Sequence, residues 1–110
     1  MLKLEIELDK KILKALDYDI DKVTEFISNG LSKVGLIEEK VENCYFLYRG
    51  PGLNTDLAHI GTIVIDVFLT YDWFKTSCKK LNLLDNSDSK DGSFYVDGDF
   101  IRSAKKYGRW

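Results

Sequence analysis

The chain has 110 residues, of which 45% are hydrophobic, 31% are charged and 13% are aromatic. These values predict one domain, residues 1–110, because either half alone would be too short to bury a core. Sixteen Lys and Arg against eighteen Asp and Glu give a net charge of −2, so no net positive field attracts the chain to nucleic acid or to anionic lipid. We therefore expect neither nucleic acid nor a membrane as a partner.

Several features of the sequence predict a cytoplasmic protein. Residues 1–10 carry charges at alternate positions and lack the apolar run of a secretory signal. The longest apolar run, Ile60–Leu69, is about half of the roughly 20 residues that a membrane-spanning helix needs. The two cysteines, Cys44 and Cys78, are expected to be reduced thiols, since a domain of this size does not depend on a single disulfide.

The first third of the chain predicts a strand followed by two helices. Over Leu2–Leu8, hydrophobic residues alternate strictly with charged residues, which is the period of a half-buried strand. Asp9 is placed to cap a short helix. A longer amphipathic helix is expected to begin at Asp21 and to stop at Gly35.

The middle of the chain predicts two strands and a third helix. Val41–Arg49 has the β-branched and aromatic content of a strand. Thr62–Thr70 is apolar on both faces except at Asp66, which favours a central strand covered by helices. A third helix is expected over 72–84, because apolar side chains there recur at helical spacing.

The C-terminal part predicts a polar loop over residues 85–92, a short strand over Ser93–Val96, a turn at residues 97–98 and a last helix from Phe100 to Tyr107. The whole pattern indicates an α+β domain with a mainly antiparallel sheet. We expect about four strands, with three to four helices packed on one face of the sheet.

A small catalytic site is one hypothesis that the sequence leaves open. His59, the only histidine, follows Asp56 in a polar loop that begins just after Arg49, and the three side chains together would suit a hydrolytic or phosphate-handling site. The aspartates of residues 85–99 do not have calcium-loop spacing, and two cysteines with one histidine do not complete a closed zinc site. We expect no metal and no cofactor, and we interpret the chain as non-catalytic.

Residues 2–31, a strand followed by ILKALDYDIDKVTEFISNGL, resemble the N-terminal module of ribbon-helix-helix antitoxins and repressors. The resemblance implies a dimer joined through residues 2–8 that reads DNA with the outward side chains of the strand. Here those side chains are Lys3, Glu5 and Glu7, and their carboxylates oppose binding to phosphates. A dimeric DNA-binding regulator or antitoxin is therefore the alternative function.

In its overall character the chain resembles the small immunity proteins of bacterial toxin and contact-dependent growth inhibition systems. Those proteins are short, single-domain, cytoplasmic, non-catalytic and mostly acidic. This chain likewise lacks a coherent set of active-site residues, and it has more Tyr and Trp than a small core can comfortably bury. The resemblance implies an inhibitor that neutralises a cognate toxin by stoichiometric occlusion.

The expected partner is a basic toxin domain, bound by acidic side chains around aromatic anchors. The expected contact residues are acids and aromatics from the middle and the end of the chain, namely Glu38, Glu39, Glu42, Tyr48, Trp73, Asp85, Asp88, Asp91, Tyr95, Asp97, Asp99 and Trp110. The identity of the partner and the oligomeric state stay open at this point.

Overall fold

A computed structural model describes the whole chain, Met1–Trp110. Its sheet has five antiparallel strands in the order β2-β3-β1-β4-β5. The strands are β1 (Leu2–Leu8), β2 (Ile37–Glu42), β3 (Tyr45–Arg49), β4 (Cys78–Asp85) and β5 (Tyr95–Asp99). The predicted α+β class and the mainly antiparallel sheet are confirmed, with one strand more than expected.

Five α-helices accompany the sheet, where three to four were expected. They are α1 (Lys10–Ala15), α2 (Ile20–Lys33), α3 (Asp56–Gly61), α4 (Asp72–Ser77) and α5 (Phe100–Lys106). Two further helical segments, the π-helical η1 (Thr62–Val67) and the 3-10 helical η2 (Phe68–Thr70), continue α3 toward α4. None of these helices is both long enough and apolar enough to span a bilayer.

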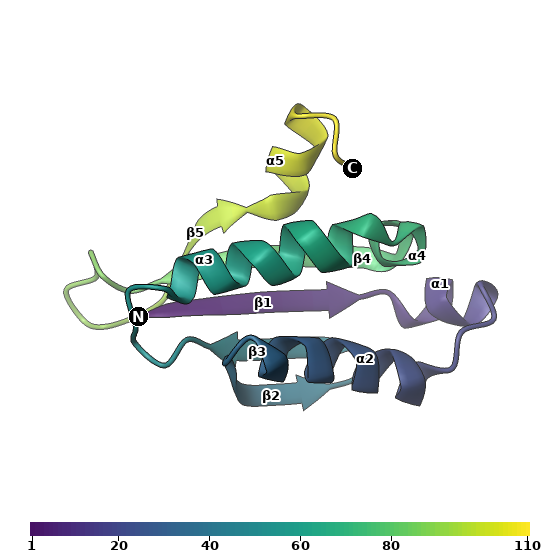
Figure 1. Cartoon of the computed structure of the whole chain (residues 1–110), viewed down its shortest axis with the longest axis horizontal. Coiled ribbons are helices and arrows are strands. Elements are labelled where there is room, and N and C mark those ends of the chain that lie inside the picture. The colour runs from purple at the N-terminus through teal and green to yellow at the C-terminus, as the bar shows by residue number, and fades with distance from the viewer.

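Strand β1 lies at the centre of the sheet and is paired along both edges, with β3 on one side and β4 on the other (Figure 1). Its inward side chains Leu4, Ile6 and Leu8 are at most 2% exposed and belong to the core. Because both edges are occupied, residues 2–8 cannot form the ribbon with a second copy that the ribbon-helix-helix resemblance implies.

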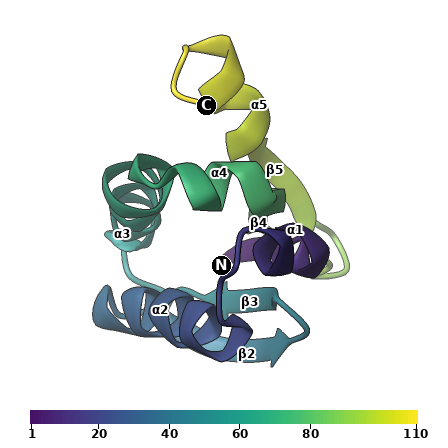
Figure 2. The ribbon, with the colours of Figure 1, turned by 90° about the vertical axis from the view of Figure 1, so that its right-hand side faces the viewer.

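The helices lie on one face of the sheet and leave its other face open (Figure 2). Helix α2 turns Val23, Ile27 and Leu31 into the same core cluster as the inward residues of β1. Asp9 caps α1 as predicted, accepting the Lys11 N–H at 2.9 Å. Helix α2 begins slightly earlier than predicted, because Asp19 rather than Asp21 accepts the free N–H groups of its first turn.

The segment Thr62–Thr70 is helical, so the predicted central strand is wrong. Its β-branched side chains favoured a strand, but Ile60, Ile63, Val64 and Phe68 recur at helical spacing and all four are buried. Tertiary packing of that stripe against the sheet overrides the local preference of the β-branched residues. Asp66, which a strand would have placed in the core, is exposed.

The predicted third helix is wrong beyond Ser77, where the chain turns into β4. Strand β4 pairs with β1 along its whole length, and Leu81 and Leu83 alternate with side chains on the open face. The predicted strand over residues 41–49 is instead a hairpin. Asn43 and Cys44 have φ values of 51° and 64°, and this left-handed turn separates β2 from β3.

The end of the chain follows the predicted order with shifted boundaries. A polar loop covers residues 86–94, and the short strand predicted over Ser93–Val96 is β5, which pairs with β4. Residues 97–98 belong to β5 and do not form the predicted turn, because Gly98 pairs with Leu83. The predicted last helix is confirmed as α5, with Asp99 as its cap.

Gly50, which ends β3, is a position where a side chain would disturb the loop that leads to α3. The buried carboxylate of Asp56 packs against the Gly50 backbone, where a Cβ would have to lie. The same carboxylate accepts the N–H groups of Gly52 and Leu53 at 2.9 and 3.1 Å. The loop is therefore closed by one aspartate that requires glycine beside it.

We predict that Gly50→Ala destabilises the fold by about 1–3 kcal/mol, because the added methyl group displaces the Asp56 carboxylate. The matched control is Gly61→Ala at a helical position with no atom near the added Cβ, which should stabilise by about 0.5–1 kcal/mol. Urea unfolding of the two variants checks both signs. Equal stability of Gly50→Ala and the wild type would contradict the packing of Asp56 on Gly50.

Candidate functional site

The three residues of the catalytic hypothesis do not form a joint site. Asp56 is buried and binds the backbone of its own loop. Arg49 lies on the open face of the sheet with the outward side chains of β3, and His59 is exposed on α3. No hydrogen bond or ion pair joins any two of them. Their proximity in sequence is explained by the loop that Asp56 closes.

The remaining groups that could carry chemistry are also accounted for by the fold. Burial raises the pKa of the Cys78 thiol to about 12, although a hydrogen bond with the Lys80 backbone acts in the opposite direction. The thiol is therefore protonated near neutral pH, where it is a poor nucleophile. Cys44 is a buried free thiol. Nowhere are three His, Cys, Asp or Glu side chains grouped so that they could hold a metal ion.

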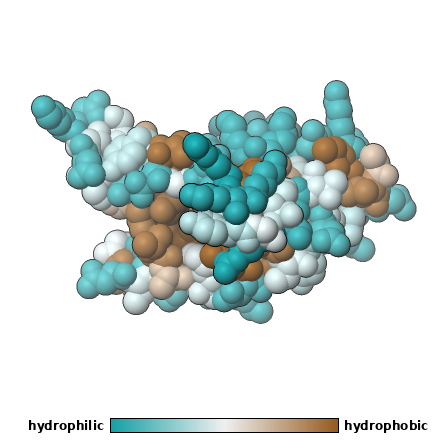
Figure 3. Space-filling view, turned by 90° about the horizontal axis from the view of Figure 1, so that it is seen from above, coloured by the Kyte–Doolittle hydropathy of each residue, from teal (hydrophilic) through white to brown (hydrophobic).

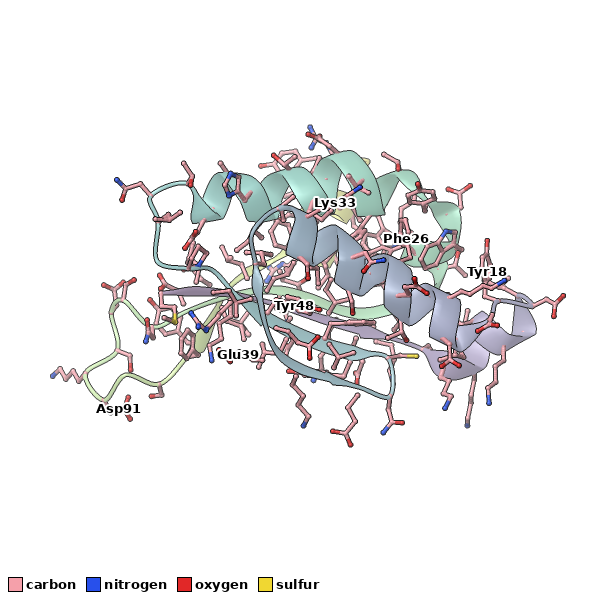
Figure 4. The ribbon with its side chains drawn as sticks, turned by 60° about the horizontal axis from the view of Figure 1, so that its bottom comes forward. Tyr18, Phe26, Lys33, Glu39, Tyr48 and Asp91 are labelled. Carbon is pink, nitrogen blue, oxygen red and sulfur yellow. The ribbon has the colours of Figure 1, made fainter.

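Among the expected contact residues, Tyr48 is the clearest correction. Its side chain is 1% exposed and lies in the core beneath α2 (Figure 4). Its hydroxyl donates to Glu38 on β2 at 3.2 Å. Alternation along β3 turns Tyr48 inward, so this aromatic side chain supports the fold and is withdrawn from the expected contact surface.

The three expected glutamates all lie on β2, which is an edge strand of the sheet. Glu39 forms an ion pair with Lys3 at 2.7 Å, and Glu42 lies 3.7 Å from Lys40. Charged side chains on an edge strand discourage pairing with the edges of other molecules. The position on an edge strand therefore gives these glutamates a structural role, preventing edge-to-edge pairing, that does not involve a partner.

The expected acids of residues 85–99 lie around the opposite edge of the sheet, and several already have partners. The Asp85 carboxylate accepts from Asn86 and Ser87, and the Asp91 carboxylate accepts from Ser89 and Ser93.

Hydrogen bonds within the loop, above all those from Ser87 and Ser93, lower the pKa of Asp85 and Asp91 respectively. Asp99 caps α5, while Asp88 and Asp97 are exposed. Tyr95 is partly buried, and its hydroxyl accepts the Asp88 N–H at 3.4 Å. The loop is therefore acidic, but several of its carboxylates already accept hydrogen bonds from within the chain.

Trp73 and Trp110 are both partly buried against the core, and only Trp73 belongs to a larger aromatic cluster. Its ring lies 5.4 Å from Tyr18, 5.8 Å from Phe26 and 5.9 Å from Tyr71, measured between ring centroids. Phe26 meets Tyr71 edge-on at 5.4 Å. We call Tyr18, Phe26, Tyr71 and Trp73 the aromatic cluster.

The aromatic cluster is assembled from two parts of the chain that are distant in sequence. Tyr18 lies in the α1–α2 corner, where Asp17 takes a left-handed φ of 64° and Asp19 caps α2. Tyr71 occupies the extended residue between η2 and α4. Figure 4 shows Tyr18 and Phe26 at the end of the molecule opposite Asp91.

The aromatic cluster is open to solvent. Tyr18, Phe26 and Tyr71 are 40%, 36% and 39% exposed. Together with Trp73 they line a groove of about 430 Å³, whose other lining residues are Asp17, Asp19, Lys22 and Val23. The phenol hydroxyls and the indole N–H have no hydrogen-bond partner within the chain. The groove therefore offers large apolar faces with polar tips and an acidic rim.

The expected contact residues include Trp73 but not the three residues around it in the aromatic cluster. A usable signal was present in Leu16–Asp21, where three aspartates alternate with apolar residues in a segment with no base.

Comparison with protein-family models, with curated proteins and with solved structures finds no match. The site is therefore characterised by its own geometry.

A second groove, of about 390 Å³, lies between η1 and α5 and is lined by Ile65, Leu69, Phe100 and Tyr107 among others. Figure 3, which looks down on this side of the molecule, shows apolar side chains exposed beside hydrophilic ones. Residues 100–110 contain four Lys and Arg and no acid. A basic partner would be repelled here and attracted to the groove at the aromatic cluster.

The open face of the sheet carries one polar network that crosses three strands. Glu5 on β1 accepts from the Tyr45 hydroxyl on β3 at 2.6 Å and from the Asn82 amide on β4 at 3.0 Å. Burial alone would raise the pKa of Glu5, but these two hydrogen bonds and the charge of Lys80 together outweigh it and lower the pKa below its ordinary value of 4.5. Burial and the bond to Glu5 raise the pKa of Tyr45.

We predict that the Glu5 network stabilises the fold at neutral pH and fails in acid. Because the folded pKa is lowered, its contribution is fully present above pH 4.5 and is lost as the pH falls through the folded value. Glu5→Gln should destabilise by about 1 kcal/mol at pH 7 and lose less stability than the wild type between pH 4.5 and 3. Urea unfolding at several pH values measures this, with Glu7→Gln as control.

Proposed function

We propose that the chain is a non-catalytic protein-binding module that neutralises a basic toxin domain by stoichiometric occlusion, as an immunity protein does. The observation that carries this proposal is the half-exposed aromatic cluster beside Asp17 and Asp19. Tyr and Trp with apolar faces and free polar tips are the commonest anchors of protein interfaces. We place this activity in the bacterial cytoplasm, where both cysteines would stay reduced.

The distribution of charge supports a basic partner. The groove at the aromatic cluster is lined by two acidic residues, Asp17 and Asp19, and one basic residue, Lys22, so its charge is negative on balance. Opposite charges on the two proteins would speed their encounter, while desolvated contacts of Tyr71 and Trp73 would slow dissociation. Inhibition would follow from covering the active surface of the toxin, with no chemical step on this chain.

The proposal predicts a one-to-one complex whose formation abolishes the activity of the partner. The tagged full chain is used to capture partners from its native host, and light scattering gives the stoichiometry of what co-elutes. The captured protein is then titrated with the purified chain while its toxic activity is measured. Complete inhibition at one equivalent is expected, and a complex that leaves the activity intact would overturn the proposal.

Two tyrosine variants test whether the aromatic cluster forms the interface. Tyr71→Ala should weaken the complex by about 30-fold or more, as expected for an interface anchor. Tyr107→Ala removes the same side chain from the groove beside α5, where it is 71% exposed, and should leave the affinity unchanged. Isothermal titration of both variants, with melting curves to verify folding, gives the comparison. Equal affinities would exclude the aromatic cluster as the anchor.

A further inference from the structure

We propose that the groove at the aromatic cluster receives the guanidinium group of an arginine side chain from the partner. This inference deepens the proposed function and rests on it, because it names the chemistry of the contact. Its physical basis is the combination of aromatic faces with carboxylates in one groove. Aromatic rings attract cations through their quadrupole, and a carboxylate can accept two parallel hydrogen bonds from a guanidinium.

The carboxylates at the rim of the groove are available for such a contact. No ion pair involves Asp17 or Asp19. Asp19 uses its Oδ1 atom to cap α2, which leaves its Oδ2 atom without a partner in the chain. Lys22 is the one basic residue of the lining, and its amine forms neither an ion pair nor a cation–π contact. The lining therefore keeps a negative charge on balance, and neither aspartate is held in an ion pair within the chain.

Elsewhere in the chain, an aromatic ring and a carboxylate together bind one of the protein's own cationic side chains. The Lys3 amine lies 4.0 Å from the centroid of the Phe94 ring and 2.7 Å from a carboxylate oxygen of Glu39. A ring and a carboxylate thus fix a cationic side chain on this protein's surface. None of the chain's own cation–π contacts involves the aromatic cluster, so this groove can accept a cation from outside.

Arginine fits the groove better than lysine does. A guanidinium is planar, so it can stack on one ring while its edge reaches a carboxylate, and it is more weakly hydrated than an ammonium group. The volume of about 430 Å³ accommodates a long side chain together with its neighbouring backbone. Tyr18 and Tyr71 hydroxyls can accept the remaining N–H groups.

The test uses the full chain and three short peptides of the form (Xaa-Gly)4, in which Xaa is arginine, lysine or citrulline. Citrulline is the neutral isostere of arginine. Binding is followed by NMR through the indole N–H signals of Trp73 and Trp110. We expect the arginine peptide to shift the Trp73 signal and to bind most tightly. Equal binding of the citrulline or lysine peptide, or a shift confined to Trp110, would overturn the inference.

A charge-removing variant locates the carboxylates that take part. Asp17→Asn with Asp19→Asn keeps the backbone, because asparagine tolerates a left-handed φ and is a good helix cap. It should weaken binding of the arginine peptide about tenfold. The control, Glu7→Gln with Asp66→Asn, changes the net charge equally at positions that do not line the groove, and should leave binding unchanged. An equal loss of affinity in both variants would show that only the net charge matters, and it would refute the site.

The same variants separate this inference from the proposed function. If Asp17→Asn with Asp19→Asn still inhibits the partner at wild-type strength while Tyr71→Ala does not, the arginine contact is refuted and the stoichiometric inhibitor stands. If the arginine peptide binds at Trp73 but no inhibited one-to-one complex forms, the groove chemistry stands and the immunity function is refuted.

Discussion

The structure depends on the pairing of β1 with two partners at once. Leu4, Ile6 and Leu8 form the middle of the core only because β3 and β4 hold β1 flat beneath the helices. Both neighbours come from later in the chain, so every strand pairing of β1 joins segments that are distant in sequence. The Glu5 network joins the same three strands across the open face. One strand therefore organises both faces of the sheet.

The central position of β1 also determines where binding surfaces can lie. With β1 internal, the edge strands are β2 and β5, and both carry charges that discourage further pairing. The acids of β2 protect an edge of the sheet, and several acids of residues 85–99 cap a helix or accept hydrogen bonds within a turn. The exposed aromatic faces instead gather where the α1–α2 corner meets α4.

Elements set by local signals were predictable, whereas those set by distant contacts were not. Alternation identified β1, the Asp9 cap identified α1, and helical stripes of apolar residues identified α2 and α5. Thr62–Thr70 was predicted as a strand and is helical, whereas Cys78–Asp85 was predicted to be largely helical and is a strand. A short apolar stretch fits either a helix or a strand, and the element that packs against it decides between them. The stripe from Ile60 to Phe68 was readable as a helix, but β4 is specified by its pairing with β1. The aromatic cluster needed the same long-range information, since Tyr18 and Trp73 meet only in the folded chain.

The distribution of charge explains how a protein with a net charge of only −2 can discriminate among partners. One groove is lined by two acids, Asp17 and Asp19, and one base, Lys22, while residues 100–110 carry four bases and no acid beside the other groove. Screening limits the field of each charge to about 10 Å at moderate salt, so the charges that line a groove act more strongly there than distant ones do. An approaching protein therefore responds to the nearer groove and not to the net charge. A basic surface is drawn to the aromatic end, where Tyr and Trp faces add the short-range contacts that charge alone does not supply.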